Sequence, residues 1–110
     1  RVDVLRDRNA LYRVTAEGRI ENGYTVKLVN KSREPRRLRI SLSPTDAVAI
    51  RGGAFEVEIE AAAVRAVPLT LDASVAQAGG RREVELVVES LDGDASLRIT
   101  HPTSFFGPVQ

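Results

Sequence analysis

Apolar and polar residues alternate one by one along most of this chain. Between Phe55 and Glu60, for example, apolar residues take every second position and glutamate takes the positions between them. Successive side chains of a β-strand point to opposite faces, so each alternating row predicts a strand with one buried face. The segments with this pattern are 2–6, 24–28, 36–42, 55–59, 67–71, 84–88 and 97–99, and a shorter one at 48–51 can add a further strand.

Residues that favour turns separate these rows, as in Ser43-Pro44, Gly52-Gly53 and Asp92-Gly93. Asp92-Gly93 lies between two rows and predicts a hairpin. No segment keeps a helical period, although the alanine-rich residues 72–80 can form one helical turn. Seven short strands in about 100 residues are typical of an immunoglobulin-like fold. We therefore predict an all-β protein, an immunoglobulin-like antiparallel β-sandwich of about seven strands that forms one domain over residues 1–110.

The predicted core lies between the two sheets and consists of aliphatic side chains. The sequence has no cysteine and no tryptophan, so the disulfide and the buried tryptophan of antibody domains are absent. The residues that we expect in this core are Val26, Leu28, Leu38, Ile40, Val57, Ile59, Leu69, Leu86, Val88 and Ile99.

Charge is unevenly distributed, although the whole chain carries a net charge of only +1. Residues 1–39 carry a net charge of +6 and residues 40–110 carry −5. A basic half could bind nucleic acid, but the sequence pI of about 8.4 is below the range typical of such domains. Strands from the two halves can instead pair and neutralise each other, and we expect no nucleic-acid partner.

The densest basic cluster consists of Arg33, Arg36, Arg37 and Arg39. It is a candidate docking surface for anionic groups such as phosphate. The alternative is a set of cross-strand ion pairs, because the third and sixth main strands of an immunoglobulin-like sandwich are neighbours.

Under this alternative, the outward-facing side chains of those two strands would meet. Arg37 and Arg39 would then pair with Glu83, Glu85 and Glu89.

No residue pattern in the chain indicates catalysis or metal binding. His101 is the only histidine, and without cysteine or methionine it has no soft co-ligand for copper or zinc. Glu56, Glu58 and Glu60 share one face of a predicted strand, where a charged row typically protects an exposed sheet edge. We expect no small-molecule substrate, no cofactor and no enzymatic activity within these 110 residues.

A set of spaced polar and aromatic residues remains unexplained by the alternation. The motifs are Asp7-Arg8-Asn9, Leu11-Tyr12, Ile20-Glu21-Asn22-x-Tyr24 and Val29-Asn30-Lys31, followed near the end by Phe105, Phe106 and Pro108. Together they resemble the immunoglobulin-like C-terminal domain of the FixG/RdxA/CcoG family. Asparagine and aspartate at strand ends can bond to nearby backbone amides, so we interpret the motif mainly as structural, with docking on a partner as the alternative.

The resemblance implies a function that belongs to a longer parent protein. Members of that family are membrane-anchored bacterial iron–sulfur proteins associated with copper handling during assembly of cbb-type cytochrome oxidases. The chain begins at Arg1 and lacks methionine, so we expect either a processed chain or a piece of a longer one. The resemblance implies that it is a C-terminal fragment of such a longer protein. The iron–sulfur clusters would lie in the parent, because this chain has no cysteine to ligate them.

The expected function is therefore that of a non-catalytic accessory or interaction domain. The parent would lie in the bacterial inner membrane, and this soluble domain would lie on the periplasmic side. Its partners would be the remainder of the parent and oxidase-assembly proteins. The alternative is a free-standing recognition domain of the fibronectin or adhesin type that binds a protein or a glycan.

Overall fold

A computed structural model describes residues 2–6, 12–76, 79–92 and 98–108 of the chain. Within these residues all regular structure is β-strand. The strands are β1 (Val2–Arg6), β2 (Arg13–Val14), β3 (Arg19–Val29), β4 (Arg36–Ser43), β5 (Ala49–Ile50), β6 (Phe55–Ile59), β7 (Val64–Ser74), β8 (Arg81–Ser90) and β9 (Arg98–Phe106).

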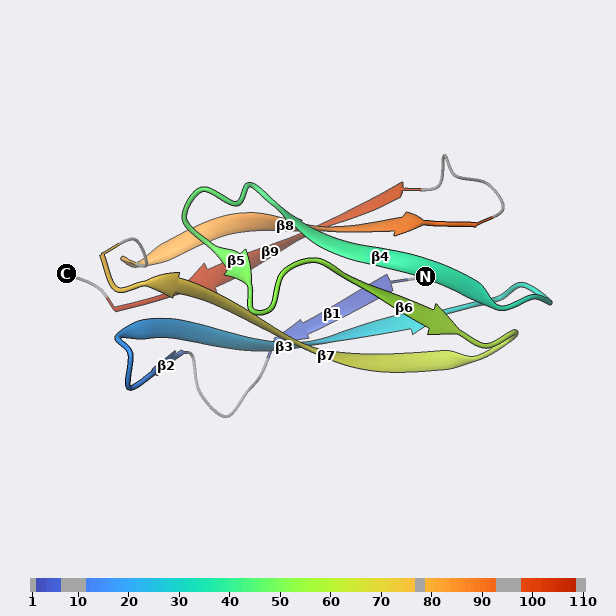
Figure 1. Ribbon diagram of the computed structural model, residues 1–110, viewed down its shortest axis with the longest axis horizontal. Helices are drawn as coiled ribbons and strands as arrows, with labels where there is room; N and C mark the ends of the chain where they lie inside the picture. The colour runs from blue at the N-terminus through green and yellow to red at the C-terminus, as the bar shows by residue number, and fades with distance from the viewer. Residues whose placement is uncertain (1, 7–11, 77–78, 93–97, 109–110) are drawn as a thin grey trace.

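The strands form two antiparallel sheets that pack face to face in an elongated body (Figure 1). One sheet has the order β1-β3-β7-β5, and β2 also pairs with β3; the other has the order β6-β4-β8-β9. The sandwich confirms the predicted fold class. The predicted third and sixth main strands, β4 and β8, are neighbours as expected, and β6 is an edge strand with its glutamates exposed.

Several local predictions can be compared with the observed strands. β5 lies within the short predicted segment 48–51, whereas β2 was not predicted. The turn between β2 and β3 requires Gly18, whose positive φ of 77° is accessible to glycine at no steric cost. The hairpin of β8 and β9 is confirmed by their antiparallel pairing, although Gly93 lies outside the described residues.

The helical turn proposed for the alanine-rich segment 72–80 is wrong for its first part. β7 continues to Ser74 because it pairs with β3 along its whole length, with Ala73 opposite Ile20. Both side chains are fully buried, so pairing and burial override the helical preference of alanine here. Residues 77–78 of this segment lie outside the described residues.

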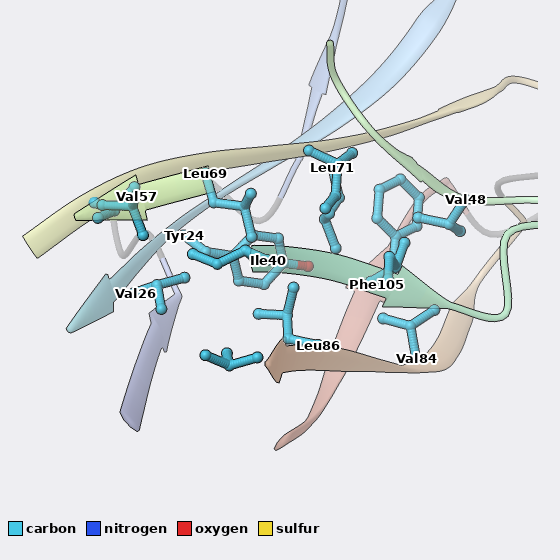
Figure 2. Packing of buried hydrophobic residues seen from close by; sticks show 14 of the residues in the cluster. Tyr24, Val26, Ile40, Val48, Val57, Leu69, Leu71, Val84, Leu86 and Phe105 are labelled. Atoms are coloured by element: carbon cyan, nitrogen blue, oxygen red, sulfur yellow. The ribbon is translucent and has the colours of Figure 1, made fainter. Parts of the chain in front are cut away.

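Side chains from both sheets meet in one aliphatic core with two large aromatic members, Tyr24 and Phe105 (Figure 2). Eight of the ten predicted core residues are buried, and Leu38 is partly buried against the same cluster. The alternation of β3, β4, β6, β7 and β8 directs these side chains inward. Ile20, Val48, Leu71 and Phe105 are further buried members that were not predicted.

The prediction that Ile99 lies in the core is wrong. Its side chain is 36% exposed, although it lies opposite the buried Val88 in the register of β8 and β9. The reason is its position: β9 is an edge strand, and Ile99 lies near its beginning, where the two sheets leave a pocket between them.

Candidate binding pocket

One end of the sandwich is closed by hydrogen bonds between the sheets, made by two residues of the sequence motif. Asn22 on β3 donates from Nδ2 to the carbonyl of Phe106 at 2.8 Å, and its Oδ1 accepts from the Phe106 amide at 2.8 Å. The Tyr24 hydroxyl donates to the carbonyl of Ser104 at 2.6 Å. β9 belongs to the other sheet, so Asn22 and Tyr24 hold its final residues against β3.

Burial raises the pKa of Tyr24 above its ordinary value of about 10, because an ionised phenol would lose solvation in the core; the nearby Arg6 acts in the opposite direction. The unfolded chain therefore releases the Tyr24 proton at a lower pH than the folded chain does. Protonated Tyr24 contributes stability that is complete below about pH 10 and is lost as the pH rises from there towards the folded pKa.

Tyr24→Phe is expected to lose about 0.5–1.5 kcal/mol at pH 7, because the hydrogen bond to Ser104 disappears. Above about pH 10 the stability of the variant should fall less steeply with rising pH than that of the unsubstituted chain. Urea unfolding across pH 7–11 measures both effects. An unchanged alkaline slope in Tyr24→Phe would show that another group controls the alkaline loss.

At the opposite end, the loop after β3 is fixed by Asn30. Its Nδ2 lies within hydrogen-bond distance of the carbonyls of Glu34, Ile59 and Glu60, at 2.9–3.1 Å. Its Oδ1 accepts from the amide and the hydroxyl of Ser32, at 3.0 and 2.7 Å. Asn30 is buried, so these bonds satisfy a polar side chain inside the fold and give the loop a defined shape.

Beside this loop the two sheets leave a pocket with a volume of about 290 Å³. The pocket lies where β1 and β9 begin and where β3 and β8 end. Its lining residues are Val2, Leu28, Val29, Asn30, Lys31, Ser32, Arg36, Leu38, Ile59, Val88, Ser90 and Ile99. Apolar side chains from both sheets form what we call the floor, and the buried Asn30 and Ser90 lie among them. The more exposed Lys31, Ser32 and Arg36 form the rim.

The charged groups that the described residues contribute to the lining are both cationic. Lys31 and Arg36 line the pocket, and no described aspartate or glutamate does so. Among the ion pairs of the described residues, none includes either cation. The pocket therefore combines an apolar floor with uncompensated positive charge at its edge.

The arginine cluster is divided by the alternation of β4. Arg36 lies opposite the buried Ile59 and lines the pocket, whereas Arg37 and Arg39 point to the outer face. Arg33 lies in the exposed loop before β4. Arg36 therefore belongs to a different surface from Arg37 and Arg39.

The predicted ion pairs of Arg37 and Arg39 with the glutamates of β8 are not among those of the described residues. Arg37 instead pairs with Glu56 of β6, with Nη2 and Oε1 at 3.0 Å. Register explains the difference for Arg37, which lies opposite Glu58 of β6 and has no partner residue on β8. Arg39 does lie opposite Glu89 of β8, but no ion pair of the described residues includes it. Both neighbours of β4 carry glutamates, and the prediction considered only β8.

Glu83 of β8 pairs locally with Arg81 at 2.8 Å and accepts a hydrogen bond from the Ser104 hydroxyl. The hydrogen bond from Ser104 is the main cause that lowers the pKa of Glu83. Desolvation opposes it, and Arg81 lowers the pKa further.

The Arg37–Glu56 pair is expected to contribute at most about 1 kcal/mol, because both side chains are largely exposed. A double-mutant cycle with Arg37→Ala and Glu56→Ala measures the coupling energy, which should decrease at high salt. A coupling energy well above 1 kcal/mol would contradict the view that this pair is weakly stabilising.

The remaining residues of the motif occupy different positions. Phe105 is fully buried in the core, Tyr12 packs partly buried against it, and Pro108 is half-buried. Asp7, Arg8 and Asn9 lie outside the described residues.

The described residues of the motif that make specific contacts lie at two separate places in the fold. Asn22, Tyr24 and Phe105 lie together at the closed end, while Asn30 and Lys31 lie at the pocket.

Sequence reasoning missed a buried carboxylate next to the closed end. Glu21 is 6% exposed and binds two arginines from other segments, Arg13 at 3.1 Å and Arg51 at 3.0 Å. Its position in the motif was the available signal, but its partners lie 8 and 30 residues away. The described residues contain no group of three potential metal ligands and no helix long and apolar enough to cross a membrane.

The fold and the pocket define an immunoglobulin-like β-sandwich domain with a concave apolar site at one end. The chain belongs to a known family of such domains: the family model described as "IG-like fold at C-terminal of FixG, putative oxidoreductase" matches residues 1–108. This confirms the resemblance inferred from the motif. No match is found among curated proteins.

Solved structures share the fold at low sequence identity. The crystal structure of a FixG-related protein from Vibrio parahaemolyticus is 22% identical with a TM-score of 0.79, covering 96% of this chain and 93% of that one. SSP-19, an MSP-domain protein like family member in Caenorhabditis elegans, is 22% identical with a TM-score of 0.50, covering 77% of this chain and 86% of that one. A protein from Archaeoglobus fulgidus is 10% identical with a TM-score of 0.52, covering 100% and 98%.

Proposed function

We propose that this chain is a non-catalytic interaction domain of a FixG-like, membrane-bound iron–sulfur protein that takes part in the assembly of cbb-type cytochrome oxidase. The parent lies in the bacterial inner membrane, and the domain lies on its periplasmic side. Its partners are the remainder of the parent and oxidase-assembly proteins. Iron–sulfur clusters belong to the parent.

The observation that carries the interaction role is the pocket between the sheets. Binding sites for other molecules are typically concave and mainly apolar, with a few polar groups that fix orientation. The pocket has this character, and its cations are not used in the ion pairs of the described residues. Membership of the FixG family supports the setting, since the family description concerns the C-terminal part of FixG.

The sequence also supports the proposal that the iron–sulfur clusters belong to the parent and the interaction role belongs to this domain. Iron–sulfur clusters are normally held by cysteine thiolates, and this chain has no cysteine. Removing the domain should therefore leave the clusters of the parent in place while it removes a surface for partners.

The test compares the full-length parent with a variant that lacks this domain, expressed in cells that need cbb-type oxidase. Loss of assembled oxidase with an unchanged cluster signal in electron paramagnetic resonance would support the proposal. Normal oxidase assembly without the domain would refute it. Loss of the cluster signal would also refute it, because the domain would then be needed for the redox centre itself.

A further inference from the structure

The pocket floor is an apolar surface that the described part of the chain leaves incompletely covered. Its apolar residues come from both sheets: Val2, Leu28, Val29, Leu38, Ile59, Val88 and Ile99. Leu28, Ile59 and Val88 are buried, but Leu38 is only partly buried and Ile99 is 36% exposed. An apolar side chain placed here would remove further apolar surface from water. This burial is favourable by about 25 cal/mol of free energy per Å².

The rim is arranged to receive a carboxylate. The Arg36 Nε donates to the Ser32 hydroxyl at 3.3 Å, which orients the guanidinium. Its terminal nitrogens have no partner among the hydrogen bonds and ion pairs of the described residues, and the same holds for the Lys31 ammonium. A guanidinium binds a carboxylate through charge-assisted and often bidentate hydrogen bonds.

The polar wall next to these cations is already formed. Asn30 uses both ends of its amide to hold backbone groups and Ser32, so it fixes the loop that carries Lys31. A site that is ordered before binding loses less conformational entropy when it is occupied. The loop that carries Lys31 therefore has a defined backbone conformation beside the apolar floor.

The size and shape of the pocket favour a peptide over a membrane surface. A volume of about 290 Å³ lies at the lower limit for whole small-molecule ligands and suits one or two amino-acid side chains. A lipid surface would require basic residues that project from a convex face, whereas Arg36 lines a concavity. The exposed Arg37 on the other face already pairs with Glu56.

We propose that this pocket binds a partner protein through a short peptide segment in which a large apolar side chain is adjacent to an acidic residue. The apolar side chain lies on the floor between the two sheets, and the carboxylate lies between Lys31 and Arg36. The inference rests on the proposed interaction role and adds the chemistry of the partner.

Binding is measured by fluorescence anisotropy on the whole 110-residue chain with labelled peptides. The probes are Gly-Ser-Phe-Asp-Ser-Gly, its Asn analogue Gly-Ser-Phe-Asn-Ser-Gly, and its Ala analogue Gly-Ser-Ala-Asp-Ser-Gly. The Phe-Asp peptide should bind about tenfold or more tightly than either analogue, and its affinity should fall with salt.

A matched pair of variants separates the pocket from general positive charge. Arg36→Gln should weaken binding of the Phe-Asp peptide about tenfold or more, whereas Arg39→Gln on the opposite face of the same strand should leave it unchanged. Ile99→Glu, which places an acid at the exposed edge of the floor, should abolish it. Unfolding curves of each variant show that the fold is retained.

Equal binding of the three peptides, or equal effects of Arg36→Gln and Arg39→Gln, would overturn the inference. Binding to phosphatidylcholine vesicles that contain phosphatidylglycerol, without binding to any peptide, would also overturn it and would favour a membrane surface. If the peptides fail to bind but the parent still requires the domain for oxidase assembly, only the pocket inference fails. If the peptides bind as expected and assembly is normal without the domain, only the proposed function fails.

Discussion

Replacing Asn22 with alanine is expected to lower the free energy of unfolding by about 2–5 kcal/mol. The side chain is 1% exposed and satisfies both the amide and the carbonyl of Phe106, which belongs to the opposite sheet. Each of these backbone groups would lose its partner, and leaving a buried polar group unsatisfied costs about 1–3 kcal/mol. Urea denaturation of the isolated chain measures the loss.

The variant Asn22→Leu distinguishes hydrogen bonding from packing. Leucine has the same number and branching of side-chain heavy atoms as asparagine but cannot donate or accept, so it should be destabilising to a comparable extent. Hydrogen exchange provides a local measurement, because the Phe106 amide should exchange faster in both variants. A loss below about 1 kcal/mol for Asn22→Ala, with normal exchange at Phe106, would show that water replaces the side chain and that Asn22 does not hold the sheets together.

Alternation was sufficient to predict the sandwich because burial in a β-sheet has a strict period of two. The row from Phe55 to Ile59 shows this directly: Val57 and Ile59 are buried, and Glu56 and Glu58 are exposed. The same rule failed for Ile99, since it assigns a face but does not say how far a facing sheet extends. At the end of the sandwich an inward-facing side chain lines an open pocket.

The polar contacts join residues that lie far apart in the sequence, and a local sequence pattern does not indicate which residues will meet. Asn22 binds a residue 84 positions away, and Asn30 binds carbonyls 29 and 30 positions away. The motif marked both asparagines as unusual for strands, but their partners follow from the packing of the sheets. For the same reason, membership of one motif did not reveal that Asn22 and Asn30 act at opposite ends.

The pocket combines residues that sequence analysis had placed in separate groups. Lys31 came from the motif, Arg36 from the basic cluster, and Ile99 from the predicted core. The register of β4 decides which arginine joins it, because Arg36 lies opposite Ile59 and faces inward. A shift of one residue would place Arg37 there instead and remove Leu38 from the floor.

Leu86→Ala is expected to lower the free energy of unfolding by about 2–5 kcal/mol, a loss comparable to that of Asn22→Ala but of different origin. Leu86 is 0% exposed and lies on β8, between Leu42 of β4 and His101 of β9. Truncation removes apolar contacts and leaves a cavity that the surrounding side chains can fill only in part. No buried polar group loses its partner in this case, so the cost comes from the lost apolar contacts and from the cavity.

A matched control for Leu86 is Leu5, which is 57% exposed on the edge strand β1. Leu5→Ala removes the same atoms but leaves no cavity, and it should cost less than about 1 kcal/mol. Guanidinium denaturation of the two variants side by side gives the difference directly. Because neither change alters a charge or a hydrogen-bonding side chain, equal losses would mean that the packing of the two sheets around Leu86 contributes little to stability. A loss several times larger for Leu86→Ala would establish that this aliphatic core, which contains no disulfide, holds the two sheets together.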